Sequence, residues 1–181
     1  MKILAMAAST SSKSINASLI RHAAQLLEGG MVPDCTVEIL DLNEFEMPLY
    51  STDRQEAGGV PELAQTFFDK IGSSDAVIFS FAEHNGTYSA AYKNVLDWAS
   101  RIDMQIFQGK QVVLFAASPG GRGGAGVLEL ATTTAPYFGA ELQASLSIGK
   151  FFDVFDSESG ELSDPEVAAE FQEALASITP A

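Results

Sequence analysis

The chain has 181 residues, of which 46% are hydrophobic and 19% charged, a composition typical of a folded protein with a buried core rather than a disordered one. Its formal net charge of −14 argues against nucleic acid or an anionic membrane surface as a partner. Cys35 is the only cysteine, so no intrachain disulfide can form, and His22 and His84 lie too far apart in sequence to predict a zinc site.

Apolar runs of strand length alternate with segments of helical spacing along the chain. The expected strands are residues 2–8, 36–42, 76–81, 111–117 and 141–148, and the expected helices are residues 17–27, 60–71, 89–102, 126–138 and 164–177. The first, third and fourth runs are continuously apolar, as in strands covered on both faces. This alternation predicts an α/β fold, a five-stranded parallel sheet with helices on both faces, in one domain over residues 1–181.

The first apolar stretch is too short for a signal peptide, and no run approaches the ~20 apolar residues of a membrane span. With a single cysteine, the sequence therefore predicts a soluble cytoplasmic protein that binds neither membrane nor nucleic acid.

Three loops are polar or rich in glycine, and each follows one of the continuously apolar strands. They are residues 9–16, 82–88 and 118–124. Ligands of open parallel sheets bind beyond the carboxyl ends of the strands. The three loops are therefore the expected ligand site.

The first loop carries five hydroxyls, one lysine and one amide between the first strand and the first helix. Short hydroxyl donors, free backbone N–H groups and the positive end of a helix dipole suit a phosphate dianion. The alternative is a serine-rich turn in which Ser14 or Asn16 is simply the N-cap of the helix.

The second and third loops carry turn signals. Asn85-Gly86 predicts a tight turn with Glu83 and His84 at its tip, whereas Leu96 and Trp98 on the following helix are expected to pack in the core. Residues 118–126 hold five glycines, which let the backbone approach a ligand closely. Arg122 is either a contact for an anionic group or a solvated surface arginine.

Two other sequence matches do not indicate the function that their patterns usually carry. Residues 121–126 match the dinucleotide pattern G-x-G-x-x-G, but they follow the fourth strand instead of the first. Residues 116–120 imitate a nucleophile elbow, but both histidines precede Ser118, which argues against a serine hydrolase.

The three loops together resemble the NADPH-dependent FMN reductase family of flavodoxin-like proteins. The family motif G-S-x-R-x-x-S-x-N matches residues 8–16, and P-E-Y-N-x-x-x-P-x-x-L-K-N-x-x-D roughly matches residues 82–97. The family's glycine-rich turn corresponds to residues 118–124. The resemblance implies a flavodoxin-like three-layer sandwich with strand order 2-1-3-4-5, and it covers residues 1–150.

The resemblance also implies an FMN site. The phosphate would be held by Ser9, Ser11, Ser14, Ile15 and Asn16, with Lys13 supplying the charge that the family's arginine provides where this chain has Ser11. Glu83, His84, Asn85 and Gly86 would line the isoalloxazine, and Ser118, Pro119, Gly120, Gly121 and Arg122 its opposite edge. The family's proline, tyrosine and second proline are Ala82, His84 and Ser89 here, which leaves the substrate preference open.

The implied activity is hydride transfer from NADPH or NADH to bound FMN and on to a small acceptor such as a quinone, free flavin or azo compound. No side chain is assigned as a catalytic acid or base, and the resemblance implies a homodimer or homotetramer paired through the helix near Ser89. Two alternatives stay open: a flavodoxin-type electron carrier, which the acidity favours, and an FMN-binding regulatory module.

Overall fold

The structure, a computed structural model, describes residues 1–180 and is built on a five-stranded parallel sheet. The strand order is β2-β1-β3-β4-β5, which confirms the order implied by the family resemblance. The strands are β1 (Lys2–Ala8), β2 (Thr36–Leu40), β3 (Ala76–Phe81), β4 (Gln111–Ala117) and β5 (Glu141–Ile148). Buried Val, Ile, Leu and Phe side chains dominate β3 and β4, as expected for central strands covered on both faces.

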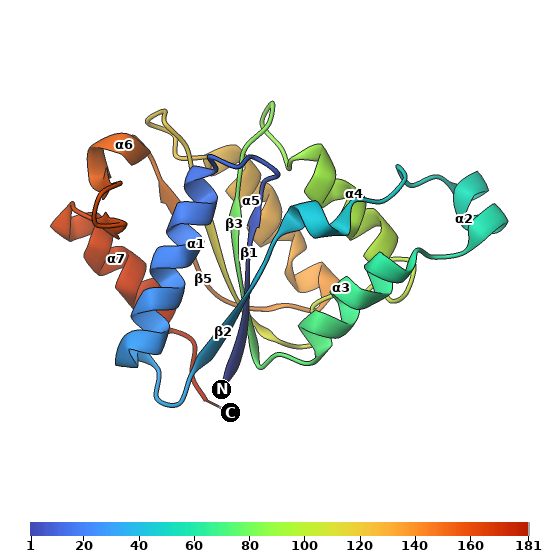
Figure 1. The fold of residues 1–181 in the computed structure, drawn as a ribbon, viewed down its shortest axis with the longest axis horizontal. Coiled ribbons are helices and arrows are strands. Elements are labelled where there is room, and N and C mark those ends of the chain that lie inside the picture. The colour runs from blue at the N-terminus through green and yellow to red at the C-terminus, as the bar shows by residue number, and fades with distance from the viewer. Residues whose placement is uncertain (181) are drawn as a thin grey trace.

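Helices cover both faces of the sheet (Figure 1). α1 (Ile15–Leu26) and α7 (Pro165–Ala176) pack on one face, and α3 (Glu62–Gly72), α4 (Ala90–Ala99) and α5 (Ala125–Thr134) pack on the other. All five helices predicted from periodicity are present. Of the two N-cap candidates for the first helix it is Ser14 that caps α1, through the N–H of Ala17, and Asp164 caps α7 just before Pro165.

Each face of the sheet has its own apolar core. Phe67, Phe79 and Trp98 are buried on the α3–α4–α5 side, and Phe115 and Phe171 are buried on the α1–α7 side. The two cores hold the strands rigidly between the helix layers, so that the strand ends form a fixed platform for the loops that follow.

Several short elements were not predicted. The second strand ends at Leu40 rather than at residue 42, because the Asp41 carboxylate accepts a hydrogen bond from the Asn43 N–H and starts the turn η2 (Leu42–Phe45). α2 (Thr52–Gly58) projects from the body of the molecule (Figure 1), and none of its seven residues, all of them described, is buried. α6 (Phe151–Val154) and the hairpin of β6 (Phe155–Asp156) with β7 (Glu161–Leu162) lie between β5 and α7.

The loops after β1, β3 and β4 meet at one edge of the sheet, opposite the edge where the chain termini lie (Figure 1). The register brings the strand ends together, since Ala8 is paired with Phe81 and Phe81 with Ala116. No helix within residues 1–180 is long and apolar enough to cross a membrane.

Candidate functional site

The loop after β1 is built from hydrogen bonds between its own residues. The Ser9 Oγ accepts from the Ser11 N–H at 3.3 Å, and the Ser11 Oγ accepts from the Lys13 N–H at 3.2 Å. Each hydroxyl that accepts in this way keeps its own O–H free to donate. Ser11 and Lys13 are exposed, so the loop presents hydroxyl donors and one cation to the solvent at the carboxyl edge of the sheet.

The start of α1 adds backbone donors to this loop. The first N–H groups of a helix have no acceptor inside the helix. The Ala17 N–H is taken by the Ser14 Oγ at 3.2 Å, which leaves the N–H groups of Ile15 and Asn16 at the positive end of the helix dipole. This arrangement fits the predicted anion site and explains how an apolar residue such as Ile15 can belong to it.

The Asn16 side chain has a structural role. It is 2% exposed, its Oδ1 accepts from the Ser80 hydroxyl at 2.7 Å and the Ala117 N–H at 3.0 Å, and its Nδ2 donates to the Ala117 carbonyl at 3.2 Å. The amide is therefore committed to β3 and β4. What Asn16 can still offer a ligand is its backbone N–H.

Two serines hold the loops in place, and neither role was predicted from the sequence. Ser80 interrupts the apolar run of β3 and is completely buried beside Asn16. Ser89 caps α4 and donates its hydroxyl to the Ala8 carbonyl at 2.9 Å. A lone serine within an otherwise apolar strand was the available signal for Ser80, because such a hydroxyl needs a buried partner.

The loop after β3 is a tight two-residue hairpin. The backbones of His84 and Thr87 exchange two hydrogen bonds, of 2.9 and 3.2 Å, around Asn85 and Gly86. Both turn residues have positive φ, 54° and 81°, as a type I′ turn requires. The predicted Asn-Gly turn is confirmed, and His84 and Asn85 lie exposed at its tip.

Glu83 connects this hairpin to α5. Its Oε2 accepts from the Val127 N–H at 3.1 Å, in the first turn of α5, whose N-cap is Gly124 and has no capping side chain of its own. A carboxylate at this position is favoured by the helix dipole. The Glu83 carboxylate thus joins two of the three loops through its Oε2.

The glycines of the loop after β4 fall into two groups. Gly123 and Gly124 have positive φ, and a Cβ on Gly123 would lie 2.5 Å from the Ser147 Oγ and 2.7 Å from the backbone of β5. These two glycines allow the loop to pack against the sheet. A Cβ on Gly120 would come no closer than 3.9 Å to a neighbouring described atom, and one on Gly121 would meet none within 4 Å. The exposed backbone of these two glycines can therefore be approached by a ligand.

The same loop is fastened to the segment that follows β5. The N–H of Lys150 donates to the Gly120 carbonyl at 3.0 Å, and the N–H of Phe151 donates to the Ser118 carbonyl at 3.2 Å. The Arg122 carbonyl accepts from the Ser147 hydroxyl, while the Arg122 side chain is exposed. The loop is a rigid backbone surface with one exposed guanidinium.

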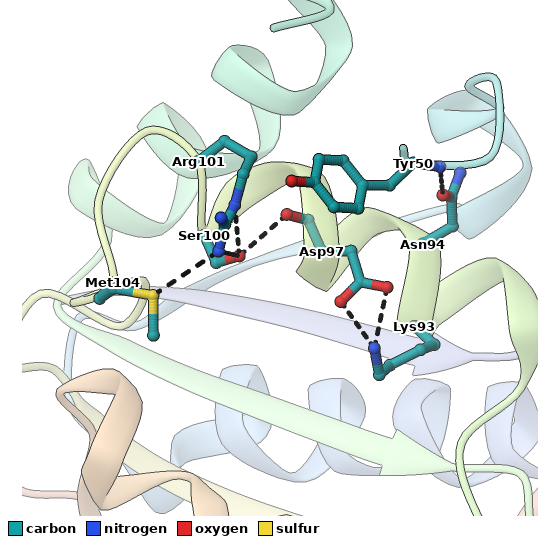
Figure 2. A network of polar contacts seen from close by, with 7 residues as sticks. All are labelled: Tyr50, Lys93, Asn94, Asp97, Ser100, Arg101 and Met104. Atoms are coloured by element: carbon teal, nitrogen blue, oxygen red, sulfur yellow. Dashed lines mark hydrogen bonds and ion pairs between the residues drawn. The ribbon is translucent and has the colours of Figure 1, made fainter. Parts of the chain in front are cut away.

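The end of the second motif lies on α4, away from the hairpin tip. Figure 2 shows the Asn94 Oδ1 facing the Tyr50 N–H, at 2.9 Å, and Lys93 paired with Asp97 on the exposed side of the helix. Asn94 also donates to the Met47 carbonyl, and the Trp98 Nε1 donates to the Pro48 carbonyl at 2.8 Å. These residues clamp segment 47–50 against α4.

The Tyr50 side chain extends this clamp. Its ring packs edge-on against Trp98, with centroids 5.1 Å apart, and the Arg101 guanidinium lies 5.4 Å from the ring centroid. Figure 2 shows Arg101 directed along the helix toward Ser100 and Met104. Trp98 is buried, as expected for a core residue, and segment 47–50 packs on α4.

Comparison with known proteins places this geometry in a family. The model of the family described as NADPH-dependent FMN reductase matches residues 1–153. An NAD(P)H-dependent FMN reductase from Pseudomonas aeruginosa is 34% identical over 120 residues, which are 66% of this chain and 61% of that protein. An NADPH:quinone oxidoreductase from Arabidopsis thaliana is 31% identical over 124 residues, 68% of this chain and 61% of that protein. The matched part of the chain thus spans about three fifths of these relatives.

Solved structures share the fold. The flavoenzyme NAD(P)H:(acceptor) oxidoreductase FerB from Paracoccus denitrificans superposes with a TM-score of 0.75 at 24% identity, over 96% of this chain and 92% of that one. An azoreductase from Bacillus anthracis gives 0.70 at 19% identity, over 97% of each chain. The strand order, the three loops and the family match agree, and the chain belongs to the NADPH-dependent FMN reductase family.

Proposed function

We propose that the chain is an FMN-dependent NAD(P)H oxidoreductase whose flavin lies across the three loops. The observation that carries this proposal is the combination, at one sheet edge, of hydroxyl and N–H donors at the start of α1 with the open backbone of Gly120 and Gly121. The first group of donors suits a phosphate and the second suits the flat ring of the same molecule. Family membership and the names of the relatives support this assignment.

The phosphate is assigned to the first loop. The hydroxyls of Ser9 and Ser11 and the N–H groups of Ile15 and Asn16 supply donors, and Lys13 supplies charge. Ser14 acts by capping α1, which keeps the helix start in place. A lysine provides a point charge instead of the two-pronged contact of an arginine, so it tolerates more than one phosphate orientation.

The ring is assigned to the space between the other two loops. The backbone of residues 83–86 would face one edge of the ring, and Ser118, Pro119, Gly120 and Gly121 the other, with the guanidinium of Arg122 available for negative charge that develops on the ring. When bound, FMN supplies the centre that takes hydride from a nicotinamide and passes two electrons to an acceptor. The chain's own residues bind and orient it, and none is required as an acid or base.

The experiment combines FMN titration with anaerobic reduction. The purified protein should quench flavin fluorescence on binding FMN, and its visible flavin absorbance should bleach rapidly when NADPH or NADH is added and return when a quinone is supplied. Lys13→Gln should weaken FMN binding about tenfold, because a charge-assisted contact to phosphate is lost. Lys110→Gln, at the opposite sheet edge, is the matched control. A protein that does not bind FMN, or equal effects of the two substitutions, would contradict the proposal.

An electron carrier is the second candidate, favoured by the net charge of −14. Tyr88 follows the hairpin tip in sequence, but it is buried against Tyr92, with ring centroids 5.0 Å apart, and its hydroxyl lies 3.3 Å from the Thr134 Oγ1. It is therefore not placed to wall in a flavin, which favours the reductase. Bound FMN that neither nicotinamide reduces would point to the carrier or to a regulatory module.

We further propose a homodimer or homotetramer in the cytoplasm. Leu49 is exposed beside a cavity of about 380 Å³ that is lined by η2 and the start of α4, and a second copy would cover this apolar surface. The family resemblance points to the same helix. A reducing compartment suits a chain whose one cysteine is Cys35. Light scattering of the purified protein measures the oligomeric state.

A further inference from the structure

The hairpin after β3 places an amide side chain next to a backbone nitrogen that can react with it. Asn85 and Gly86 are both exposed at the hairpin tip. The two hydrogen bonds of the turn join His84 and Thr87, and neither uses the Gly86 N–H or the Asn85 amide. A Cβ built on Gly86 would meet no described atom within 4 Å, so the glycine is open on the side where other residues carry a side chain.

This arrangement permits the amide to be lost through a cyclic imide. The Gly86 nitrogen attacks the Asn85 Cγ, an N–Cγ bond forms, the Cγ–Nδ2 bond breaks, and Nδ2 leaves as ammonia with the Gly86 proton. Water then opens the ring. Cleavage of the new N–Cγ bond gives aspartate, and cleavage of the bond from the same nitrogen to the main-chain carbonyl carbon of residue 85 gives isoaspartate. Solvent water is the co-reactant, and glycine hinders the attack least because it carries no Cβ.

The other three of the chain's four asparagines are protected from this reaction. Asn16 and Asn94 are buried on helices, and their Nδ2 atoms donate to backbone carbonyls. Asn43 is exposed, but its Nδ2 donates to the Asp41 carboxylate at 2.8 Å, and Glu44 follows it with a side chain in the way of the attack. The hairpin asparagine therefore combines an exposed, unengaged amide with a following glycine, and the others do not.

From these observations we propose that Asn85 is a deamidation site and that its deamidation weakens flavin binding. The inference rests on the proposed function. In that assignment residues 83–86 face one edge of the ring, so bound FMN covers the turn and slows the reaction. In the FMN-free protein, aspartate adds a negative charge beside the place of an anionic ligand. Isoaspartate inserts a methylene into the backbone and disrupts the two-residue hairpin.

The modification runs in one direction, because the ammonia that leaves is lost to the solvent. A molecule that has released its flavin therefore loses, with time, the turn that would bind it again. A molecule that keeps its flavin keeps the turn intact. Deamidation would thus divide a population of this protein into loaded molecules that persist and empty molecules that are inactivated.

Peptide mapping of the purified full chain measures the reaction directly. A lysine or arginine separates each asparagine from the next, so trypsin places all four in different peptides. After incubation at mildly alkaline pH, peptide 71–93, which contains Asn85, should gain the mass of an amide-to-acid conversion. Peptide 22–54 contains the exposed Asn43 and is the internal control, which should gain little. Saturating FMN should slow the conversion of peptide 71–93. Equal conversion of the two peptides, or an equal rate with and without FMN, would overturn the inference.

Titration with FMN measures the consequence. Incubated protein should bind FMN about tenfold more weakly than fresh protein, and fresh Asn85→Asp should be weakened in the same direction. Asn85→Gln keeps an amide whose longer side chain closes a ring much less readily. This variant is the matched control, and its affinity should be the same before and after incubation.

Conversion of peptide 71–93 without loss of FMN affinity, or an equal loss in Asn85→Gln, would overturn the inference. If fresh protein does not bind FMN, the proposed function fails. The comparison of the two peptides then still decides whether Asn85 is a deamidation site.

Discussion

Two buried asparagines, one on each side of the sheet, do similar chemistry with different consequences. Asn16 on α1 is 2% exposed and Asn94 on α4 is 8% exposed, and each makes three hydrogen bonds. Asn16 bonds to Ser80 and to both backbone groups of Ala117, inside the central strands. Asn94 bonds to the backbone of segment 47–50, which leads to α2, a helix in which no residue is buried. Each asparagine comes from one of the family motifs.

This comparison shows that a motif residue can be required for the scaffold without touching a ligand. Asn16 fixes the start of α1 to the end of β4, and so sets the position of the proposed phosphate loop relative to the glycine loop. Asn94 fixes to α4 the start of the segment between η2 and α3, which contains α2 and is called the excursion below. Loss of the first should weaken the whole fold, and loss of the second should mainly release the excursion.

The largest effect is expected for Asn16→Ala. It leaves the N–H and carbonyl of Ala117 and the Ser80 hydroxyl buried without partners, and should lower the free energy of unfolding by about 3 kcal/mol. Urea unfolding measures this value. Ser80→Ala removes one of the three bonds and should cost about 1 kcal/mol. If Asn16→Ala were no more destabilising than Ser80→Ala, the scaffold role of Asn16 would be refuted.

A smaller and local effect is expected for Asn94→Ala. Segment 47–50 can move away from α4 when these bonds are lost, and its backbone groups then reach water, so the loss of unfolding free energy should be about 1 kcal/mol. Trypsin should cleave faster after the exposed Arg54 on α2, because the excursion is released at its start.

The control for this variant is Lys93→Gln. It breaks only the exposed ion pair with Asp97 and should change the unfolding free energy by about 0.3–0.5 kcal/mol. Cleavage after Arg54 should stay at the rate of the unaltered protein. Equal cleavage of the Asn94→Ala protein and this control would show that Asn94 does not hold the excursion.

The smallest expected effect is on the pH dependence of stability, and it comes from His22, a buried polar side chain on the same side of the sheet as Asn16. His22 on α1 is 6% exposed, stacks on Phe171 with centroids 5.6 Å apart, and its Nδ1 has no hydrogen-bond partner among the described residues. Burial lowers the pKa of this imidazole below its usual range, against the smaller opposite effect of Glu161. The neutral form is therefore the one that the fold accommodates.

The sign of the pH dependence follows from this lowered pKa. Below about pH 6.5 the unfolded chain binds a proton at His22 that the folded protein does not bind. The free energy of unfolding should therefore decrease as the pH is lowered, until the pH passes the pKa of His22 in the folded protein. The slope should be at most about 1.4 kcal/mol per pH unit. Urea unfolding between pH 7 and 5 measures this slope. His22→Leu should reduce the slope, whereas the same change at the exposed His84 should retain it. An unchanged slope in His22→Leu would show that this ring does not contribute.

Much of the fold could be predicted because it follows from local patterns. The continuous apolar runs of β1, β3 and β4 indicated strands that are covered by helices on both faces. Asn85-Gly86 marked a turn, and Ser14 was one of two candidates for the start of the first helix. The short elements between β5 and α7 were missed, because segments of two to four residues carry no periodic signal. α2 was missed because it has no buried face to produce one.

The sequence by itself determined which loops gather at the sheet edge, because the carboxyl ends of parallel strands must meet there. It also placed a run of hydroxyls, two cations and a cluster of glycines in those loops. Only the tertiary structure decided which of those groups face outward. Asn16 and Glu83 turn inward to Ala117 and Val127, and Gly123 packs on β5 while Gly121 stays open. The physical reason is that a buried polar group must find a partner, and that partner can lie a hundred residues away in the chain.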